Sequence, residues 1–450
     1  MAAKRKRVEV VDPREAKRQS ATKSNTPKAR LAATSSASEI IPNGAHKNGA
    51  HKATTEEDDT TYDPASTLTV QIVTGDYERI THGLAAAIPA VALSNKDSDA
   101  NITFSETFLF TAHTASVRCL AISPKTENDK RFLATGSADE RINVYSISTA
   151  PPRPSTTTLN GAVIAENANN RSLGSLTHHD RAVARLTFPA KGKLFSAAED
   201  NTIAISRTRD WTMLSSIKAP IPKVQGRPSG DTAAPGEVPT GVNDFAIHPS
   251  QKLMLSAGVL NFDRELLNHV GEGKHSSGEG RRVTWDDAGE QYVYAIMPAL
   301  QEAGNGLLAI STEDGRILFY DISEQSPAAG NALPQLGCVA QLGGKSAGVS
   351  SRIKDFIVLP VPSVNAQAPA WLVVAAGSDG SLWLWYLGGE ELNGADKASS
   401  AQVGRLIATH KTQSRITCLG AFVMDGKQAE LPTASAAAEA EKSEIDDDSD

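Results

Sequence analysis

Short apolar runs separated by turn residues recur through the middle of the chain. From Leu68 onward these runs are rich in β-branched residues, and Gly, Asp, Asn or Pro follows most of them, which predicts β-strands. Residues 1–67 contain few large apolar side chains and cannot bury enough surface to offset their chain entropy. We therefore expect a mostly-β domain over residues 68–425 between two disordered tails, a basic one at 1–67 and an acidic one at 426–450.

One hairpin pattern repeats along this domain: an apolar strand ends in small residues and an acid, and a second strand follows. Four copies carry Asp139, Asp200, Asp314 and Asp379 at the turn, and a weaker fifth copy at 70–84 carries Glu78 there. The acceptor side chain can bond neighbouring backbone and so fix the turn. Six residues beyond the acid, the pattern places Tyr145, Tyr320 or Trp385, but Ser206 in the second copy. We expect the blade of Ser206 to be less well packed.

A further strand precedes most of these hairpins, and three such strands have a histidine shortly before them. These histidines are His113, His178 (with His179 beside it) and His410. We expect each to lie in the loop before its strand and to hydrogen-bond towards the acidic turn. Because they are dispersed over different repeats, a metal site is not expected.

Units with a histidine lead-in, an Asp turn and a following aromatic resemble the WD-repeat β-propeller. The resemblance implies an all-β fold of seven blades. Residues 415–422 are a strand without a hairpin and 70–84 a hairpin without a first strand, so the two should pair and complete the last blade. The third blade should be incomplete, because the strand ending at Gly258 has no second half of its hairpin before Arg281.

The motifs TGDYER at 74–79, SRTRDW at 206–211 and RITCLG at 415–420 are more specific. They resemble the p21-activated-kinase-interacting WD-repeat proteins and their fungal counterpart, an assembly factor of the large ribosomal subunit. The resemblance implies a non-catalytic scaffold in nuclear or nucleolar assembly of the 60S subunit. It would be a monomer within a larger particle, contacting pre-60S proteins. The alternative that it implies is a negative regulator that binds a p21-activated kinase. A ubiquitin-ligase adaptor is disfavoured, since no hairpin ends in the Asp-x-Arg pattern of such adaptors.

The formal net charge of −7 conceals two tails of opposite sign. Within the basic tail, two clusters are expected to form a nuclear import signal that binds an import receptor, and the same cations could contact ribosomal RNA. Those clusters are Lys4, Arg5, Lys6 and Arg7, and Lys17 and Arg18. In the acidic tail, Ser443 is followed by acids and is a candidate site for an acidophilic kinase. A merely solubilising tail is the alternative.

No catalytic grouping is apparent in the sequence. It lacks a Gly-rich phosphate loop, a His-Glu metal motif and a nucleophile elbow, so we expect no enzymatic activity and no cofactor. Three scattered cysteines argue against a disulfide framework. No apolar stretch approaches the roughly 20 residues that span a bilayer, so no membrane association is expected. We expect partners to bind the face that bears the Asp-turn loops, with Tyr77, Glu78 and Arg79 as the candidate partner-binding residues.

Overall fold

The computed structural model describes fifteen separate ranges of the chain. They are residues 67–94, 101–153, 158–159, 162–165, 167, 169–219, 241–252, 254–258, 282–285, 292–295, 300–302, 307–321, 338–361, 369–393 and 401–425. The expected basic and acidic tails lie outside these ranges, with the import clusters and Ser443. The first strand begins at Thr67, one residue before the expected boundary.

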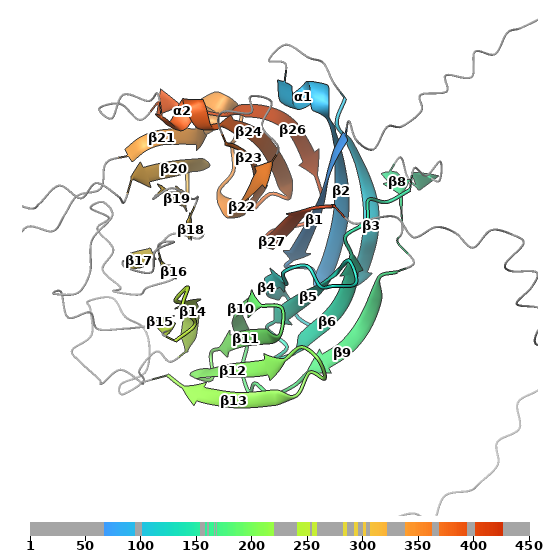
Figure 1. The fold of residues 1–450 in the computed structure, drawn as a ribbon, viewed down its shortest axis with the longest axis vertical. Coiled ribbons are helices and arrows are strands. Elements are labelled where there is room, and N and C mark those ends of the chain that lie inside the picture. Colours follow the sequence, from blue (N-terminus) through green and yellow to red (C-terminus); the bar gives the residue numbers. More distant parts are fainter. Residues whose placement is uncertain are drawn as a thin grey trace, which may run out of the picture. The chain divides into compact units, whose positions relative to one another are not determined.

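Strands make up nearly all the regular structure in the described residues, and they form seven sheets that succeed one another around a common centre (Figure 1). The first complete sheet contains β4 (Val117–Ile122), β5 (Lys130–Ser137), β6 (Ile142–Ser148) and β9 (Arg171–Leu176). The second contains β10 (Val183–Ala190), β11 (Lys193–Ala198), β12 (Thr202–Arg207) and β13 (Met213–Lys218). The next two sheets have two described strands each, β14 (Val242–Ile247) with β15 (Met254–Gly258), and β16 (Arg282–Trp285) with β17 (Tyr292–Ala295).

The fifth sheet is β18 (Leu300–Glu302), β19 (Leu307–Ser311), β20 (Arg316–Asp321), β21 (Cys338–Gly343) and the short β25 (Ala401–Gln402). The sixth is β22 (Ile353–Val361), β23 (Ala370–Gly377), β24 (Ser381–Gly388) and β26 (Arg405–Lys411). The seventh is β27 (Ile416–Val423), β1 (Thr67–Asp76), β2 (Ile80–Pro89), β3 (Thr103–Thr111), β8 (Ala162–Ile164) and β7 (Thr158–Leu159). The helices are short: α1 (Ala90–Ser94), α2 (Gly389–Asn393) and a 3-10 turn at Lys345–Ala347.

The two ends of the strand series meet in the seventh sheet. β27 pairs antiparallel with β1, from Val70 opposite Val423 to Asp76 opposite Ile416, as the sequence predicts. The expected gap of the third blade falls on residues 259–281, outside the described residues. The described strands of that blade are β14 and β15, which pair in the order expected of a first and second strand.

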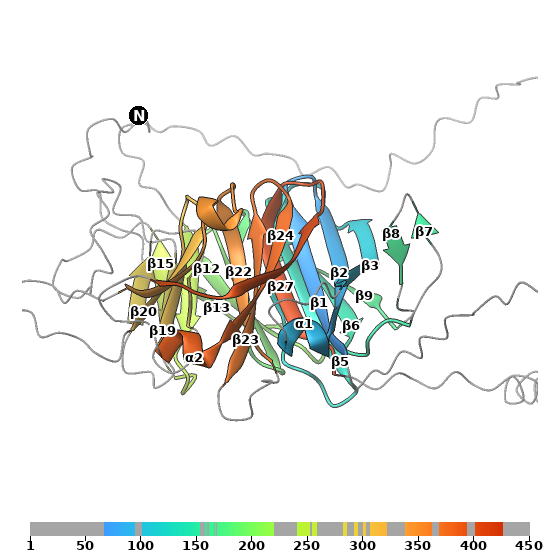
Figure 2. The same ribbon diagram turned by 90° about the horizontal axis from the view of Figure 1, so that it is seen from above.

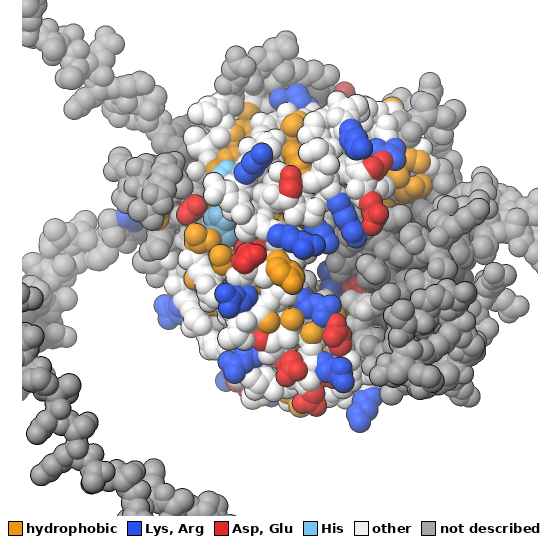
Figure 3. Space-filling view, turned by 180° about the vertical axis from the view of Figure 1, so that it is seen from behind, with side chains coloured by type: hydrophobic (Ala, Val, Ile, Leu, Met, Phe, Trp, Pro, Cys, Tyr) orange, Lys and Arg blue, Asp and Glu red, His pale blue; other side chains and the backbone are white. Residues whose placement is uncertain are grey.

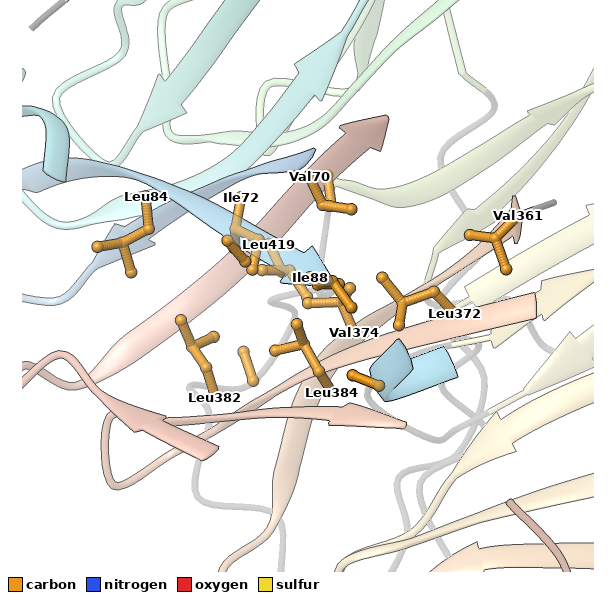
Figure 4. Close-up of a cluster of buried hydrophobic side chains, with 14 of the residues drawn as sticks. Val70, Ile72, Leu84, Ile88, Val361, Leu372, Val374, Leu382, Leu384 and Leu419 are labelled. Atoms are coloured by element: carbon orange, nitrogen blue, oxygen red, sulfur yellow. The ribbon is translucent and has the colours of Figure 1, made fainter. Parts of the chain in front are cut away.

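Figure 2 shows the sheets side by side, seen from above. The hydrophobic core lies between consecutive sheets. Between the sixth and seventh sheets, Ile72 and Leu84 meet Val374 and Leu384 from the other sheet (Figure 4). Alternate residues of a strand face opposite sides of its sheet. Since both sides are covered here, eight successive residues of β1 are buried, including the polar Thr69, Gln71, Thr74 and Asp76.

Candidate functional site

The predicted acidic turns occupy equivalent positions in five sheets. In each, the residue after the acid has a left-handed backbone, at Arg79 (φ 74°), Glu140 (68°), Asn201 (62°), Gly315 (83°) and Gly380 (83°). Gly and Asn adopt this conformation most readily, whereas other residues do so at a cost. The five copies therefore share one turn geometry although their sequences differ.

His113 joins its lead-in loop to the turn of Asp139. Its Nδ1 lies 3.1 Å from both carboxylate oxygens of Asp139, and its Nε2 lies 2.9 Å from Oγ1 of Thr135. The backbone N–H groups of Thr114 and Arg141 also donate to Asp139. The side chain of His113 is fully buried, so this network fixes the loop, as the sequence predicts.

In the second sheet His179, and not His178, makes the corresponding contacts. The Nδ1 of His179 lies 3.0 Å from Oδ2 of Asp200, and its Nε2 lies 2.8 Å from Oγ of Ser196. His178 instead packs on the ring of His179 and contacts Ser196. His113 and His179 each precede the first residue of their strand by four positions, so this spacing could have identified the right histidine.

His410 does not join an acidic turn either. It lies inside β26, six residues before β27, and its ring stacks on Phe104 of β3 at a centroid distance of 4.6 Å. The side chain thus packs between the sixth and seventh sheets. Strand β26 continues through the position that the sequence assigns to a loop.

The remaining turn acids have other partners. Asp379 accepts hydrogen bonds from the Ser351 hydroxyl (2.7 Å) and from the Ser381 backbone, and Asp314 accepts from Arg316 (2.8 Å). Glu78 is exposed, and Asp76 takes the turn contact there by accepting the N–H of Ile80 at 2.7 Å. Asp76 follows Gly75 directly, where the first sheet has Ser137 after Gly136, and it accepts the backbone N–H equivalent to the one that Asp139 accepts from Arg141.

Burial and hydrogen bonding shift the pKa values of these groups. Burial lowers the pKa of His113 despite the opposing charge of Asp139, and burial together with the neighbouring His179 lowers the pKa of His178 to about 4. Burial alone would raise the pKa of Asp139 and Asp200, but the hydrogen bonds that each accepts hold it below its ordinary value. Both carboxylates therefore stay ionised at neutral pH.

The order Ser196, His179 and Asp200 has the hydroxyl–imidazole–carboxylate arrangement of a hydrolase triad. Ser196 is only 1% exposed and His179 only 4%, so no substrate can reach the hydroxyl. The equivalent Thr135 beside His113 is fully buried. These arrangements hold the sheets' turns in place.

The candidate binding turn lies at the tip of the β1–β2 hairpin. Tyr77 is 57% exposed, Glu78 and Arg79 are exposed beside it, and the guanidinium of Arg415 lies 5.4 Å from the Tyr77 ring centre. The Tyr77 N–H donates to the carbonyl of Arg415 at 2.9 Å. The turn is thus anchored by its backbone while its three side chains face solvent.

A set of contacts between neighbouring blades was not foreseen from the sequence. The third residue of β14 and of β10 contacts the neighbouring blade: Asp244 accepts the N–H of Val283 at 3.0 Å, and Arg185 pairs with Asp244 at 2.9 Å. Cys119 at the same position lies 3.8 Å from the carbonyl of Val183. The alignment of VRC, VAR and VND at the strand starts could have indicated this position.

The described residues contain no group of three or more His, Cys, Asp or Glu side chains that could hold a metal ion. In that same part of the chain, no helix has the length and apolar character needed to cross a bilayer. Burial raises the pKa of the Cys418 thiol well above its usual range, which keeps it protonated. Figure 3 shows basic and acidic side chains interspersed on one face of the molecule.

Comparison with known proteins supports the WD-repeat fold. The family model for the WD domain, G-beta repeat, matches residues 104–146. The chain is 24% identical over 348 residues to a p21-activated protein kinase-interacting protein 1-like of Xenopus laevis, covering 71% of this chain and 75% of that protein. The Danio rerio protein of the same name is 26% identical, with 78% and 80% covered.

Protein MAK11 of Saccharomyces cerevisiae is 30% identical over 188 residues, or 41% of this chain and 38% of that protein. Among solved structures, the RRP9 WD40 repeats align with a TM-score of 0.35 and 12% identity over 78% of this chain and 83% of that one, which is too weak to support a conclusion. The chain thus contains a WD repeat over residues 104–146 within a fold of β-propeller type, and the proteins to which it is similar include the p21-activated protein kinase-interacting proteins and yeast Protein MAK11.

Proposed function

We propose that this protein is a non-catalytic scaffold in the nuclear or nucleolar assembly of the large (60S) ribosomal subunit. The resemblance of TGDYER, SRTRDW and RITCLG to the fungal assembly factor supports this proposal, as does the similarity to Protein MAK11. The buried state of Ser196 and His179 supports the non-catalytic part. Pre-60S proteins are the proposed partners.

The exposed turn of Tyr77, Glu78 and Arg79 is the observation that carries the binding role. Its backbone is held by the Asp76–Ile80 hydrogen bond and by the bond from Tyr77 to Arg415. A turn that is ordered before binding loses little conformational entropy when a partner docks. An exposed tyrosine beside arginine is also the composition of binding hot spots.

Sedimentation of cell lysate on a sucrose gradient tests the proposal. We expect the protein to comigrate with precursors of the large subunit, and Tyr77→Ala combined with Arg79→Glu to move it to the light fractions. Arg141→Glu, at the corresponding turn of the first sheet, is the matched control and should leave the profile unchanged. Sedimentation of the unaltered protein only as a small complex would contradict the assembly role.

A second candidate, regulation of a p21-activated kinase, is favoured by the vertebrate relatives, whose names state kinase interaction and which align over most of their length. In this case the light fractions should contain the protein bound to such a kinase. Adding the purified protein should then reduce the kinase's phosphorylation of a model substrate. Unchanged phosphorylation at saturating protein would rule out the regulatory role.

The tails supply two further parts of the proposal. Lys4, Arg5, Lys6 and Arg7, with Lys17 and Arg18, are proposed to bind an import receptor, and Ser443 to be phosphorylated; all lie outside the described residues. Deletion of residues 1–20 should leave the protein cytoplasmic, while nuclear retention would refute the import signal. If the basic tail also binds ribosomal RNA, its contribution should fall steeply with added salt.

A further inference from the structure

Three loops and the end of β27 come together at the strand ends that lie opposite the acidic turns. The loops are residues 123–131 in the first sheet, and 191–193 and 207–212 in the second. Figure 1 shows these two sheets side by side, with β27 next to β4. We call the surface formed by these loops and residues 424–425 the lower face.

Ion pairs join the parts of the lower face to one another. Lys125 pairs with Asp129 at 2.9 Å and with Asp425, at the end of β27, at 3.1 Å. Lys191 of the second sheet pairs with Glu127 of the first at 2.6 Å. One series of contacts therefore runs from the C-terminal end of β27 across the first sheet into the second.

The motif SRTRDW at 206–211 fixes the turn of the second sheet on this face. Trp211 has a left-handed backbone (φ 57°), which is costly for a bulky residue, and its ring packs edge-on against Phe132 of β5 at a centroid distance of 5.2 Å. The hydroxyl of Thr208 donates to the carbonyl of Lys191 at 2.7 Å. The turn is thus held against the first sheet and the neighbouring loop, and Arg209 stands exposed between these two anchors.

The lower face has an excess of positive charge. It contains seven Lys or Arg and four Asp or Glu, a net charge of +3. Lys193 and Arg209 are exposed, and neither forms an ion pair with another residue that the structure describes. Lys193 also lies directly opposite Arg207 in the strand register, and like charges in such a pair repel. A carboxylate bound beside Lys193 would relieve this repulsion.

The chain carries an anionic segment that begins at this face. Residues 426–450 contain eight Asp or Glu and two Lys, a net charge of −6. They follow Asp425, which is exposed and joined to Lys125. A segment of this length can extend over at most roughly 80–90 Å, so its last acids can reach the second sheet. Because the segment is tethered beside its site, many individually weak ion pairs can hold it there.

We propose that the acidic tail, residues 426–450, binds the lower face of its own chain. The terminal carboxylates, within residues 444–450, accept charge-assisted hydrogen bonds from Lys193 and Arg209. The bound tail then shields the lower face from other polyanions, such as nucleic acid. This contact lies at the opposite strand ends from the turn of Tyr77 and does not depend on the assembly role.

Carbodiimide cross-linking of the full-length protein tests the contact, because this reagent joins a carboxylate to an amine only where the two groups touch. We expect mass spectrometry to find links from residues 444–450 to Lys193. Lys218 is the control, since it is exposed in the same sheet but lies at the other end of β13. A mixture of isotopically labelled and unlabelled chains shows whether each link forms within one chain.

A matched pair of variants tests the role of the SRTRDW turn. Arg209→Glu should lower the yield of links between the tail and Lys193 at least about threefold, because Arg209 holds the tail without itself reacting with the carbodiimide. Lys218→Glu makes the same change in net charge and should leave the yield unchanged. Melting temperatures show that both variants fold. A yield that is insensitive to Arg209→Glu would overturn the proposal.

Competition with a synthetic peptide of residues 426–450 gives a second measurement. In one full-length variant, the eight acids of the tail are replaced by Asn and Gln. The peptide should bind this variant at least about tenfold more tightly than the unaltered chain, whose own tail occupies the face. Its affinity should also fall as salt is added. Equal affinity for the two chains would contradict the proposal.

Three other outcomes would also overturn it. Links from the tail chiefly to residues 1–52 would show that the two tails bind each other. Links only between labelled and unlabelled chains would show that the tail binds a second copy. A short RNA that binds the unaltered chain and the variant with the neutral tail equally well, and is lost with Arg209→Glu, would show that the tail does not occupy the lower face.

Discussion

Asp355 in β22 accepts the backbone N–H of Leu419 in β27 through Oδ2 at 3.0 Å, and so joins the sixth blade to the C-terminal strand. Its Oδ1 accepts the N–H of Phe356. The carboxylate therefore connects residues 64 positions apart in the chain. Because β27 also pairs with β1, this contact supports the sheet in which the first and last strands meet.

Replacement of Asp355 by Ala should lower the free energy of unfolding by about 1–3 kcal/mol, because the N–H of Leu419 is left unpaired. Urea denaturation of the full-length protein measures the change. Asp425→Ala removes an exposed carboxylate that pairs with Lys125, and should cost less than about 1 kcal/mol. Equal effects of the two substitutions would contradict the role given to Asp355.

His179→Ala should destabilise the protein more than His178→Ala. His179 is 4% exposed and contacts Asp200, Thr202 and Ser196, so its loss leaves polar groups unsatisfied at a cost of about 2–3 kcal/mol. The substitution His178→Ala removes only a contact with Ser196 and the packing on the ring of His179. Thermal unfolding of the two variants under identical conditions checks the order, and the reverse order would refute the assignment.

Stability should fall as the pH is lowered from 6.5 to about 4. The pKa of His178 is about 4 in the folded protein against 6.5 as its ordinary value, so the unfolded chain binds the proton first as the pH falls through this window. Burial lowers the pKa of His82 and His410 as well, with the same sign. Melting temperatures measured across this window should decline, and His178→Gln should reduce the slope. An unchanged slope in that variant would show that His178 does not contribute.

Ser206→Ala should be neutral or stabilising by up to about 1–2 kcal/mol. Ser206 is 1% exposed, and its hydroxyl has no hydrogen-bond partner among the described residues, so the substitution removes a buried polar group without loss of a contact. Ser196→Ala is the control. That equally buried hydroxyl lies 2.8 Å from Nε2 of His179, so its removal should lower the free energy of unfolding. Urea denaturation that shows equal losses for both would refute this account.

Gly136→Ala should lower the free energy of unfolding by about 1–3 kcal/mol through overpacking. A Cβ at Gly136 would lie 2.7 Å from Cγ1 of Val183 in the next blade and 2.8 Å from Sγ of Cys119. Gly192→Ala meets nothing within 4 Å and should have little effect. Urea denaturation of both variants separates the effect of close contact between blades from the general cost of replacing a glycine.

The strands and their turns could be predicted from the sequence because both are local. The alternation of apolar and polar residues, the content of β-branched residues and the spacing of an acid after small residues are all signals contained within about 15 residues. Hence the five acidic turns fall at equivalent backbone positions, and residues 415–422 pair with the first hairpin. Glu78 stands at the expected turn position, but the backbone contact is made by Asp76, an acid at the position that Ser137 holds in the first sheet.

Local pattern alone thus determined that this chain forms β-hairpins of one repeating type, and where their turns lie. Only the tertiary structure decided which of two adjacent histidines meets Asp200, that His410 packs on Phe104, and that Asp355 reaches Leu419. It also decided that the ends of β27 and β10 meet the same loop of the first sheet. These relationships depend on how neighbouring blades approach each other, and contacts between distant segments leave no periodic trace in a single sequence.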